Sequence, residues 1–417
     1  MLNPLDSTNI PLAGLHVLVP KVVLAEPWQD AVANARAKST RPFLPNRVQA
    51  LDALSKDLLR HPRLRRDAAG AALGFWLRRA HLTHLEQEFS GRTVPGRRVA
   101  AGLVFHIAPG NVDTMFIYSW ALSFLAGNAN VVRLTSDRSP LMNDLLECLD
   151  RVVIADPSVF SGNFFVSYGH DEATTEYLSA QCDLRIVWGG DETVRRIRAI
   201  PLNPHASERA FASKRSLTVI SSHEYALSDE AARKRLADRF AGDIAPFGQM
   251  ACSSPHVIFW FGTAEAGEKA RQDFESSMQA AMAAKSGEPD LAQAVRRLNH
   301  AFNSVAEGRA VGMNHTAHMT HIRATNPTSA ESAEVCGAGL LAHGVVESLE
   351  ALQPLLRRDH QTITYYGLNP AELDALVTVA GSAGVDRIVP IGRALDFGPY
   401  WDGYSLWDDL VRTVVVE

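Results

Sequence analysis

The chain has 417 residues, of which 46% are hydrophobic and 21% are charged, a composition typical of globular proteins with two or three domains at this length. Its net charge of −5 leaves no basic excess for neutralising phosphates, so we expect no nucleic-acid partner. The four cysteines form no C-x-x-C pair, which disfavours a disulfide framework and a structural zinc site.

No basic cluster followed by an apolar core marks the N-terminal residues, and no apolar run approaches the roughly 18 residues of a membrane span. We therefore expect neither a signal peptide nor a membrane span, and a cytoplasmic location. A short strand is predicted at residues 15–19. Apolar residues then recur at helical spacing over residues 47–87, and Pro62 divides that region into two predicted helices.

Strand and helix patterns alternate between residues 99 and 190. Strands are predicted at residues 99–107, 130–134, 163–167 and 184–188, and helices at 115–125, 142–153 and 172–179. This alternation predicts a parallel sheet with crossover helices, and ligands of such sheets bind at the carboxyl ends of the strands. The polar and glycine-containing segments at those ends are Pro109-Gly110-Asn111, Thr135-Ser136 and Gly189-Gly190.

Two glycine patterns are candidates for a phosphate-binding turn. Gly189 and Gly190 follow a clear strand and precede a helix, which suits a nucleotide, although a plain strand-to-helix turn explains them equally well. Residues 337–342 match G-x-G-x-x-A, but the preceding residues 331–336 have the pattern of a polar helix. We therefore do not assign a dinucleotide site to that second segment.

The second half of the chain begins with a predicted strand at residues 216–220 and a charged helix at 229–240. An alanine-rich helical region covers residues 264–306, a strand is predicted at 386–390, and an aromatic loop and a β-rich tail follow. A terminal strand of this kind pairs either with a sheet of its own chain or with a partner subunit.

Cys252 lies among small residues, between Gly248-Gln249 and a β-type run at residues 256–261. Small neighbours keep a sulfur accessible, and backbone N–H groups near the start of an element stabilise an anion, so Cys252 is a candidate nucleophile. The alternative is a small, buried, apolar cysteine.

Three histidines, His315, His318 and His321, recur at three-residue intervals. Their β-branched neighbours predict a strand, on which the three side chains cannot converge, and the local sequence offers no carboxylate to complete a ligand set. We therefore predict no metal site.

The ordered motifs together resemble one family, the acyl-CoA reductases of the bacterial bioluminescence type, a divergent branch of the aldehyde dehydrogenase superfamily. The resemblance rests on residues 74–79, 106–112, 118–121, 125–133, 187–192, 249–255, 361–367 and 386–393, in that order along the chain. It implies an aldehyde-dehydrogenase-like α/β fold with a Rossmann-like cofactor domain, an α/β catalytic domain and a β tail.

The resemblance also implies roles for single residues. Cys252 matches the nucleophile, and Asn111 matches the asparagine whose amide completes the oxyanion hole. His315 begins a segment that resembles the Gly-His-Thr-Ala of CoA-acylating aldehyde dehydrogenases, which makes it a candidate active-site histidine. Cofactor contacts are implied for Pro109, Gly110, Arg133, Thr135, Ser136, Gly189 and Gly190.

Two positions depart from the pattern. Ala210 occupies the position of the glutamate that activates water in hydrolytic aldehyde dehydrogenases, so a thiol rather than water should enter or leave. Asp113 occupies a position where the family leads us to expect proline, and a carboxylate there would change the polarity of the substrate pocket.

We therefore predict an enzyme that reduces an acyl thioester, either acyl-CoA or a carrier-bound acyl group, to an aldehyde. NADPH is the expected cofactor because the Arg133 guanidinium suits a 2′-phosphate, with NADH as the other possibility. Residues 1–220 would bind the cofactor, residues 221–390 would carry the catalytic cysteine, and residues 391–417 would form a returning loop and terminal strand.

Two other functions fit the same motifs. The enzyme could instead oxidise an aldehyde and acylate CoA, or it could serve as an acyl-accepting scaffold subunit. An acyl-activating synthetase is a candidate partner, and a homo-oligomer is expected from the terminal strand and the family.

Overall fold

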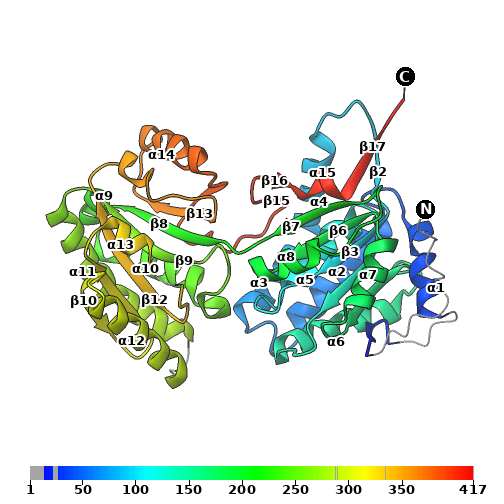
Figure 1. The fold of residues 1–417 in the computed structure, drawn as a ribbon, viewed down its shortest axis with the longest axis horizontal. Coiled ribbons are helices and arrows are strands. Elements are labelled where there is room, and N and C mark those ends of the chain that lie inside the picture. Colours follow the sequence, from blue (N-terminus) through cyan, green and yellow to red (C-terminus); the bar gives the residue numbers. More distant parts are fainter. Residues whose placement is uncertain (1–13, 22–26, 287, 289, 334, 417) are drawn as a thin grey trace. The chain divides into compact units, whose positions relative to one another are not determined.

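The structure is a computed structural model that describes residues 14–21, 27–286, 288, 290–333 and 335–416. The chain divides into two compact units, unit 1 (Met1–Ala212 with Ser405–Glu417) and unit 2 (Ser213–Tyr404) (Figure 1). The functional division at residues 220 and 390 stays a prediction.

Unit 1 is built on a six-stranded sheet in the order β1-β5-β4-β3-β6-β7. Its strands are β1 (His16–Val19), β3 (Leu103–Ile107), β4 (Ala129–Leu134), β5 (Asn163–Ser167), β6 (Leu184–Trp188) and β7 (Ser207–Phe211). β1 is antiparallel to β5, and the other five strands are parallel. Because β4 and β5 lie on one side of β3 while β6 and β7 lie on the other, the topological switch point falls between β3 and β6.

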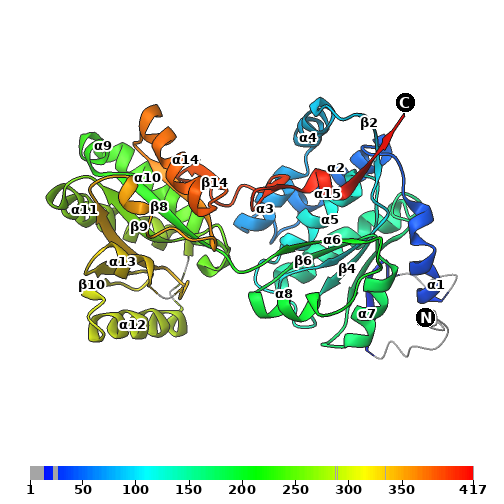
Figure 2. The ribbon, with the colours of Figure 1, turned by 45° about the horizontal axis from the view of Figure 1, so that its top comes forward.

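The helices of unit 1 cover both faces of this sheet (Figure 2). They are α1 (Trp28–Ala33), η1 (Ala35–Lys38), α2 (Pro45–Arg60), α3 (Ala68–Trp76), α4 (Arg79–Gly91), α5 (Met115–Leu125), α6 (Pro140–Ala155), α7 (Glu172–Gln181), α8 (Asp191–Arg198) and α15 (Leu406–Leu410). Side chains of α1, α7 and α8 share one hydrophobic core with β3, β4 and β5. All eleven residues of α5 are buried, which fits a helix with apolar residues on every side.

Most predicted elements of unit 1 are confirmed, including the strands at 163–167 and 184–188 and the helix at 115–125. The single strand predicted at 99–107 is wrong, because the segment forms β2 (Gly96–Ala100) and then β3. Gly102 separates the two strands with φ +133°, a conformation that favours glycine. A Cβ at this position would also lie 2.1 Å from a carboxylate oxygen of Asp183.

Two other expectations in unit 1 are resolved by the fold. The helical region at 47–87 contains three helices rather than two, because Asp67 caps a new helix by accepting a hydrogen bond from the Gly70 N–H at 2.8 Å. The terminal strand β17 (Val411–Val415) pairs antiparallel with β2 of its own chain, in a separate two-stranded ribbon.

Unit 2 has a seven-stranded sheet in the order β10-β11-β12-β9-β8-β13-β14. Its strands are β8 (Arg215–Ser221), β9 (Pro255–Phe261), β10 (Ala310–His315), β11 (Thr320–Ala324), β12 (Leu340–Val346), β13 (His360–Tyr366) and β14 (Arg387–Pro390). β10 pairs antiparallel with β11, and all other pairs are parallel. A short hairpin of β15 (Tyr400–Trp401) and β16 (Tyr404–Ser405) follows in the chain.

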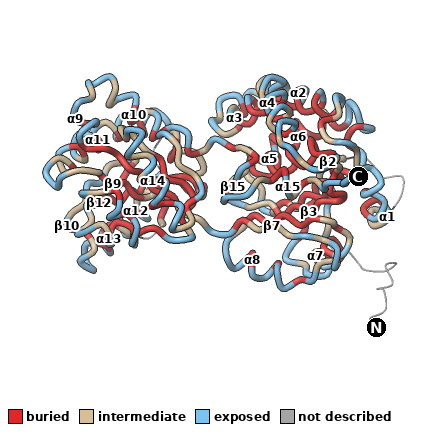
Figure 3. The backbone as a smooth tube through the Cα atoms, turned by 90° about the horizontal axis from the view of Figure 1, so that it is seen from above, coloured by how far each residue is buried: buried red, intermediate tan, exposed pale blue. Residues whose placement is uncertain are grey.

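The helices of unit 2 are α9 (Ser222–Leu227), α10 (Glu230–Ile244), η2 (Pro246–Gln249), α11 (Ala264–Ser286), α12 (Leu291–Ala306), α13 (Pro327–Glu331), η3 (Glu350–Leu352) and α14 (Pro370–Ala383). One core joins the sheet to α9, α10 and α11, and a second joins it to α13, η3 and α14. The strands between these cores are largely buried (Figure 3). The helix predicted at 331–336 is wrong, because α13 ends at Glu331.

Within the described part of the chain, none of the helices combines the length and the apolar character that crossing a membrane would require.

Candidate active site

Cys252 lies in the loop before β9, at the amino edge of the unit 2 sheet. Three consecutive residues of this loop, Phe247, Gly248 and Gln249, have positive φ angles of 55°, 57° and 65°. A left-handed conformation is unfavourable for Phe and Gln, so the surrounding contacts must hold the backbone there.

The Gln249 side chain supplies such contacts. It is fully buried, and its Nε2 donates to the carbonyls of Pro255 at 2.8 Å and Leu340 at 3.0 Å. Its Oε1 accepts from the Gly339 N–H at 2.9 Å. Gln249 therefore joins the cysteine loop to the first residues of β9 and β12, and the Ser216 hydroxyl fixes the Cys252 carbonyl at 2.8 Å.

Cys252 differs from the other three cysteines, all of which are among the described residues. Cys148, Cys182 and Cys336 are buried, whereas Cys252 is of intermediate exposure. Burial raises the pKa of Cys148 and of Cys182 to about 12. Among these four cysteines only Cys252 is partly exposed, and its loop is held by the contacts described above. The nucleophile role of Cys252 stays a prediction.

The Cys252 thiol has polar neighbours that the sequence did not reveal. Burial, together with the Asp402 carboxylate, raises the pKa of Cys252 to about 11. A hydrogen bond with the Gln361 side chain and the backbone N–H groups of Cys252 and Ser253 lower it. The Arg387 guanidinium also interacts electrostatically with the thiol. Gln361 and Arg387 lie within segments that resemble the family, and no local pattern distinguishes Asp402.

The predicted cofactor residues lie at the carboxyl edge of the unit 1 sheet. Pro109, Gly110 and Asn111 follow β3, and Gly189 and Gly190 follow β6, so both segments flank the topological switch point. That is where ligands of doubly wound sheets bind. Asn111 and Gly110 are exposed.

Gly110 lies against the end of the neighbouring strand β4. A Cβ on Gly110 would approach the Thr135 Cβ to 4.0 Å, so these two predicted residues adjoin each other. Ser136 beside Thr135 is exposed.

Arg133 lies near the end of β4, and not all of its hydrogen-bond donors are paired. Its Nη2 donates to the carbonyls of Tyr168 at 3.4 Å and Gly169 at 3.2 Å, and its guanidinium stands 4.9 Å from the Tyr168 ring centroid. Its Nε is buried and has no hydrogen-bond partner among the described residues. Burial lowers the pKa of Arg133, as does the Arg196 guanidinium, so two positive charges adjoin this site.

Gly189 and Gly190 precede α8, and Gly190 is its N-cap without a side-chain hydrogen bond. A Cβ on Gly189 would meet Thr193 atoms at 3.0 and 3.1 Å, so the turn is close-packed. The backbone N–H groups of this helix start suit a phosphate, although the acidic first turn, Asp191 and Glu192, offsets part of that attraction.

Two departures from the family pattern are placed by the structure. Ala210 is on β7 and pairs with Val187 of β6, and no carboxylate occupies its position. The Asp113 carboxylate accepts a hydrogen bond from the Ser139 hydroxyl at 2.7 Å. Because Ser139 caps α6, Asp113 is tied to that helix start.

His315 lies at the end of the edge strand β10, where its Nδ1 contacts the Thr320 hydroxyl at 2.8 Å. Burial lowers its pKa. β10 is three strands from β9, so a lateral separation of roughly 14 Å stands between His315 and the start of the cysteine strand. The structure of unit 2 does not bring His315 to the sulfur.

His321, on β11, does have a carboxylate nearby, unlike the expectation from local sequence. Glu275, His321 and His343 place one ligand-type atom each within 4.8 Å of one another. The Trp260 N–H, which can only donate, points to His343 Nδ1 at 3.2 Å, so the proton of neutral His343 is on Nε2. That Nε2 contacts His321 Nδ1 at 2.9 Å, and Glu275 is hydrogen-bonded by Arg271. The two histidines are therefore hydrogen-bonded to each other and to Trp260, while Glu275 is bonded to Arg271 and to the Asn314 amide.

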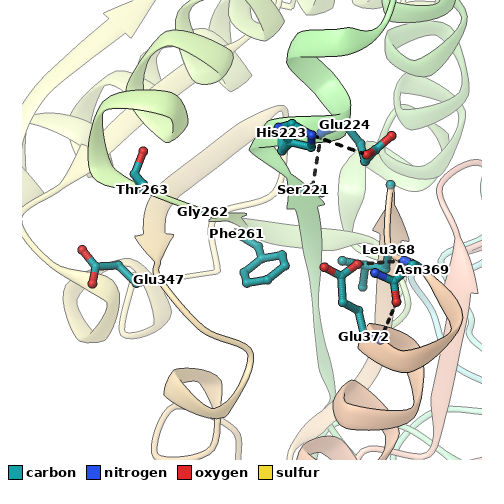
Figure 4. Close-up of a pocket in the computed structure, with 11 residues that line it drawn as sticks. Ser221, His223, Glu224, Phe261, Gly262, Thr263, Glu347, Leu368, Asn369 and Glu372 are labelled. Carbon is teal, nitrogen blue, oxygen red and sulfur yellow. Dashed lines mark hydrogen bonds and ion pairs between the residues drawn. The ribbon is translucent and has the colours of Figure 1, made fainter.

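A cavity of about 760 Å³ lies at the carboxyl edge of the unit 2 sheet (Figure 4). Cys252 precedes β9 and therefore lies at the opposite edge. It is lined by Ser221, His223, Glu224, Phe261, Gly262, Thr263, Glu347, Gly367, Leu368, Asn369 and Glu372. The helix N–H groups here are already capped, since Ser221 accepts from Glu224 N–H and Asn369 from Glu372 N–H. With three glutamates and no arginine or lysine among the described residues that line it, this cavity does not suit a phosphate.

Comparison with known proteins defines the fold class first. An aldehyde dehydrogenase of Mycobacterium tuberculosis complexed with NAD+ superposes with a TM-score of 0.64 at 13% identity, over 93% of this chain and 89% of that one. Aldehyde dehydrogenase 21 of Physcomitrella patens, in complex with succinate, gives 0.66 at 14% over 93% and 89%. An oxidoreductase of Marinobacter aquaeolei gives 0.67 at 12% over 93% and 90%. The fold is that of the aldehyde dehydrogenases, as predicted.

The family follows from the sequence model described as acyl-CoA reductase (LuxC), which matches residues 94–413. The chain belongs to this family, and the prediction from the ordered motifs is confirmed. It is an aldehyde-forming acyl-CoA reductase whose substrate is an acyl thioester. No curated protein sequence matches the chain significantly.

Proposed function

We propose that the reductase works through an acyl-enzyme on Cys252, with a nicotinamide cofactor held at the switch point of unit 1. The observation that carries this proposal is the contrast among the four cysteines, of which only Cys252 is partly exposed. Its loop is fixed by Gln249 and Ser216, so the sulfur is held in a defined position.

The Cys252 sulfur attacks the acyl carbonyl, and the Asn111 amide and the Cys252 backbone N–H stabilise the tetrahedral oxyanion. The carrier thiol leaves, and Cys252 retains the acyl group as a thioester. A bound nicotinamide would supply the hydride that reduces this acyl group. The Cys252 sulfur is then expelled from the resulting hemithioacetal, and the aldehyde is released.

Ala210 supports reduction over hydrolysis. A glutamate at this position would activate water against the Cys252 thioester, whereas a methyl group can neither accept a proton nor orient a water molecule. The acyl-enzyme therefore persists until hydride arrives.

Arg133 supports NADPH over NADH. Arg133 is only partly buried, and its guanidinium together with the nearby Arg196 charge fits a 2′-phosphate, since a guanidinium pairs strongly with phosphate. Thr135 and Ser136 would contact the adenosine ribose, and Pro109, Gly110, Gly189 and Gly190 would surround the rest of the dinucleotide.

We further propose that the acyl donor is CoA or a carrier-bound thioester delivered by a synthetase, and that the chain forms a homo-oligomer. The ribbon of β2 and β17 supports self-association, because Val414, Val415 and Val416 are 46%, 55% and 71% exposed.

Intact-mass spectrometry after incubation with a panel of acyl-CoA thioesters tests the mechanism. We expect the wild type to gain one acyl mass that NADPH removes, Cys252→Ala to gain none, and the control Cys336→Ala to behave as wild type. An acyl mass that NADPH and NADH both leave in place would favour the scaffold function. Acylation of Cys252→Ala would overturn the proposal.

A further inference from the structure

The Cys252 thiol needs a proton acceptor. Because burial raises its pKa to about 11, the sulfur is protonated at neutral pH, and its attack on an acyl carbonyl must release a proton. The superfamily's glutamate cannot serve, since Ala210 stands in its place.

Gln361 connects the thiol to a carboxylate. Its Nε2 donates to Asp402 Oδ1 at 2.6 Å, and its side chain also hydrogen-bonds the Cys252 thiol. The Gln361 Oε1 has no partner among the described residues, so the amide NH2 makes both contacts. The sulfur and the Asp402 oxygen are two acceptors of one nitrogen, so they are at most roughly 6 Å apart, a separation that one bridging water spans.

A tight hairpin turn positions Asp402. Asp402 and Gly403 lie between β15 and β16 with φ +50° and +77°, the left-handed pair that a two-residue Asp-Gly turn favours. The turn packs closely against Asp386, because a Cβ on Gly403 would lie 2.6 Å from Asp386 Oδ1. The hairpin therefore fixes the backbone from which the Asp402 carboxylate reaches Gln361.

The charges around Asp402 leave it suited to accept a proton. Burial raises the pKa of Asp402, the Asp386 carboxylate raises it further, and Gln361, Lys214 and Arg358 lower it. A carboxylate whose pKa moves toward neutrality is a better proton acceptor at the pH where it remains ionised.

We propose that Asp402 is the general base of the acylation step and that Gln361 is the residue that positions it. This inference rests on the proposed acyl-enzyme at Cys252. The S–H bond of Cys252 breaks as its sulfur bonds the acyl carbon, and Asp402 takes the proton. The carbon–sulfur bond to the carrier then breaks, and the carrier thiolate takes the proton from Asp402. No electron is gained or lost, and Asp402 is ionised again.

If Asp402 affected Cys252 only through its charge, the Asp402→Asn substitution would have a different effect on the thiol. Removing a negative charge beside Cys252 lowers the thiol pKa, so Asp402→Asn should leave alkylation by iodoacetamide unchanged or faster. If Asp402 accepts the proton, the same change slows acyl transfer. In Asp402→Asn the rate of acylation should therefore fall while the rate of alkylation stays unchanged or rises.

The experiment measures single-turnover acylation of Cys252 by rapid-quench mass spectrometry against pH, with an acyl-CoA found to load the wild type, alongside iodoacetamide alkylation. We expect Asp402→Asn to acylate about 100-fold more slowly at pH 7 and to lose the rise of rate with pH that reports Asp402 ionisation. Asp402→Glu should recover part of the rate. Gln361→Met should slow acylation while keeping that rise. Asp396→Asn, an exposed carboxylate paired with Arg393, should match the wild type.

The inference would be overturned if Asp402→Asn were acylated at the wild-type rate at every pH. It would also be overturned if the rates of acylation and alkylation fell together, because that result would indicate a disordered loop. Failure of the wild type to load Cys252 would instead refute the acyl-enzyme itself. Thermal unfolding of each variant identifies a folding defect. If Asp402→Asn does not fold, the acylation rate of Asp402→Glu tests the inference, because this variant retains a carboxylate.

Discussion

Units 1 and 2 arrange five parallel strands in the same order, β5-β4-β3-β6-β7 and β12-β9-β8-β13-β14, and both begin at the central strand. Each therefore has a switch point at its carboxyl edge, yet the candidate chemistry lies at opposite edges. In unit 1 it is the carboxyl edge, with Asn111 and Gly189. In unit 2 the cysteine lies at the amino edge.

The charge at each switch point accounts for this difference. The switch point of unit 1 offers glycines, an α8 start without a side-chain cap, and the Arg133 and Arg196 guanidinium groups near the end of β4. The corresponding crevice of unit 2 is lined by Glu224, Glu347 and Glu372. Strand order alone therefore defines where a crevice forms, and the side chains decide whether it accepts an anionic cofactor.

The amino edge of unit 2 is usable because several strand starts contribute side chains there. Ser216 and Gln361 are the second residues of β8 and β13, and Arg387 is the first of β14. Each is linked to Cys252 or its backbone. The cysteine thus has neighbours from distant parts of the chain that no single loop could supply.

The largest effect is expected at the switch point of unit 1. We expect Asn111→Ala to lower kcat roughly 100-fold or more, because one oxyanion donor contributes on the order of 3 kcal/mol to the transition state. Steady-state reduction of acyl-CoA measures the effect. Asn143→Ala, an exposed asparagine on α6, is the matched control. If Asn111→Ala kept the wild-type rate, Asn111 of unit 1 would not be an oxyanion donor.

A smaller effect is expected at Arg133, the residue proposed to bind the 2′-phosphate of NADPH. Arg133→Leu should raise the KM for NADPH roughly 10- to 100-fold, because a hydrogen bond to a charged group contributes about 1.5–3 kcal/mol. The KM for NADH should change less than about threefold, since NADH lacks the 2′-phosphate. Arg151→Leu, which loses ion pairs with Asp57 and Glu147 on another surface, serves as control. Equal loss with both cofactors would contradict the 2′-phosphate contact.

The smallest effect is expected at the switch point of unit 2. Glu347→Lys and Glu224→Gln should change kcat and the KM for NADPH by less than about twofold, because no phosphate is expected in this acidic cavity. Fluorescence titration with NADPH provides a second measurement. A tenfold change in the affinity for NADPH in either variant would instead indicate that the dinucleotide binds in unit 2.

Much of this protein is determined by local sequence. Apolar periodicity predicted β5, β6 and α5 at their observed bounds, because a strand or helix buried on both sides needs an uninterrupted apolar segment. Small residues around Cys252 and the ordered motifs pointed to a thioester reductase, and the family is confirmed.

Contacts between residues far apart in the sequence follow from the way the strands and helices pack. The break at Gly102 depends on β2 joining the last strand of the chain, which no local pattern records. His321 meets Glu275 and His343 because β11, β12 and α11 adjoin, although the sequence around His321 offers no carboxylate. Gln361 and Asp402 reach Cys252 for the same reason: strand order and a tight turn, rather than spacing along the chain, bring their side chains to one sulfur.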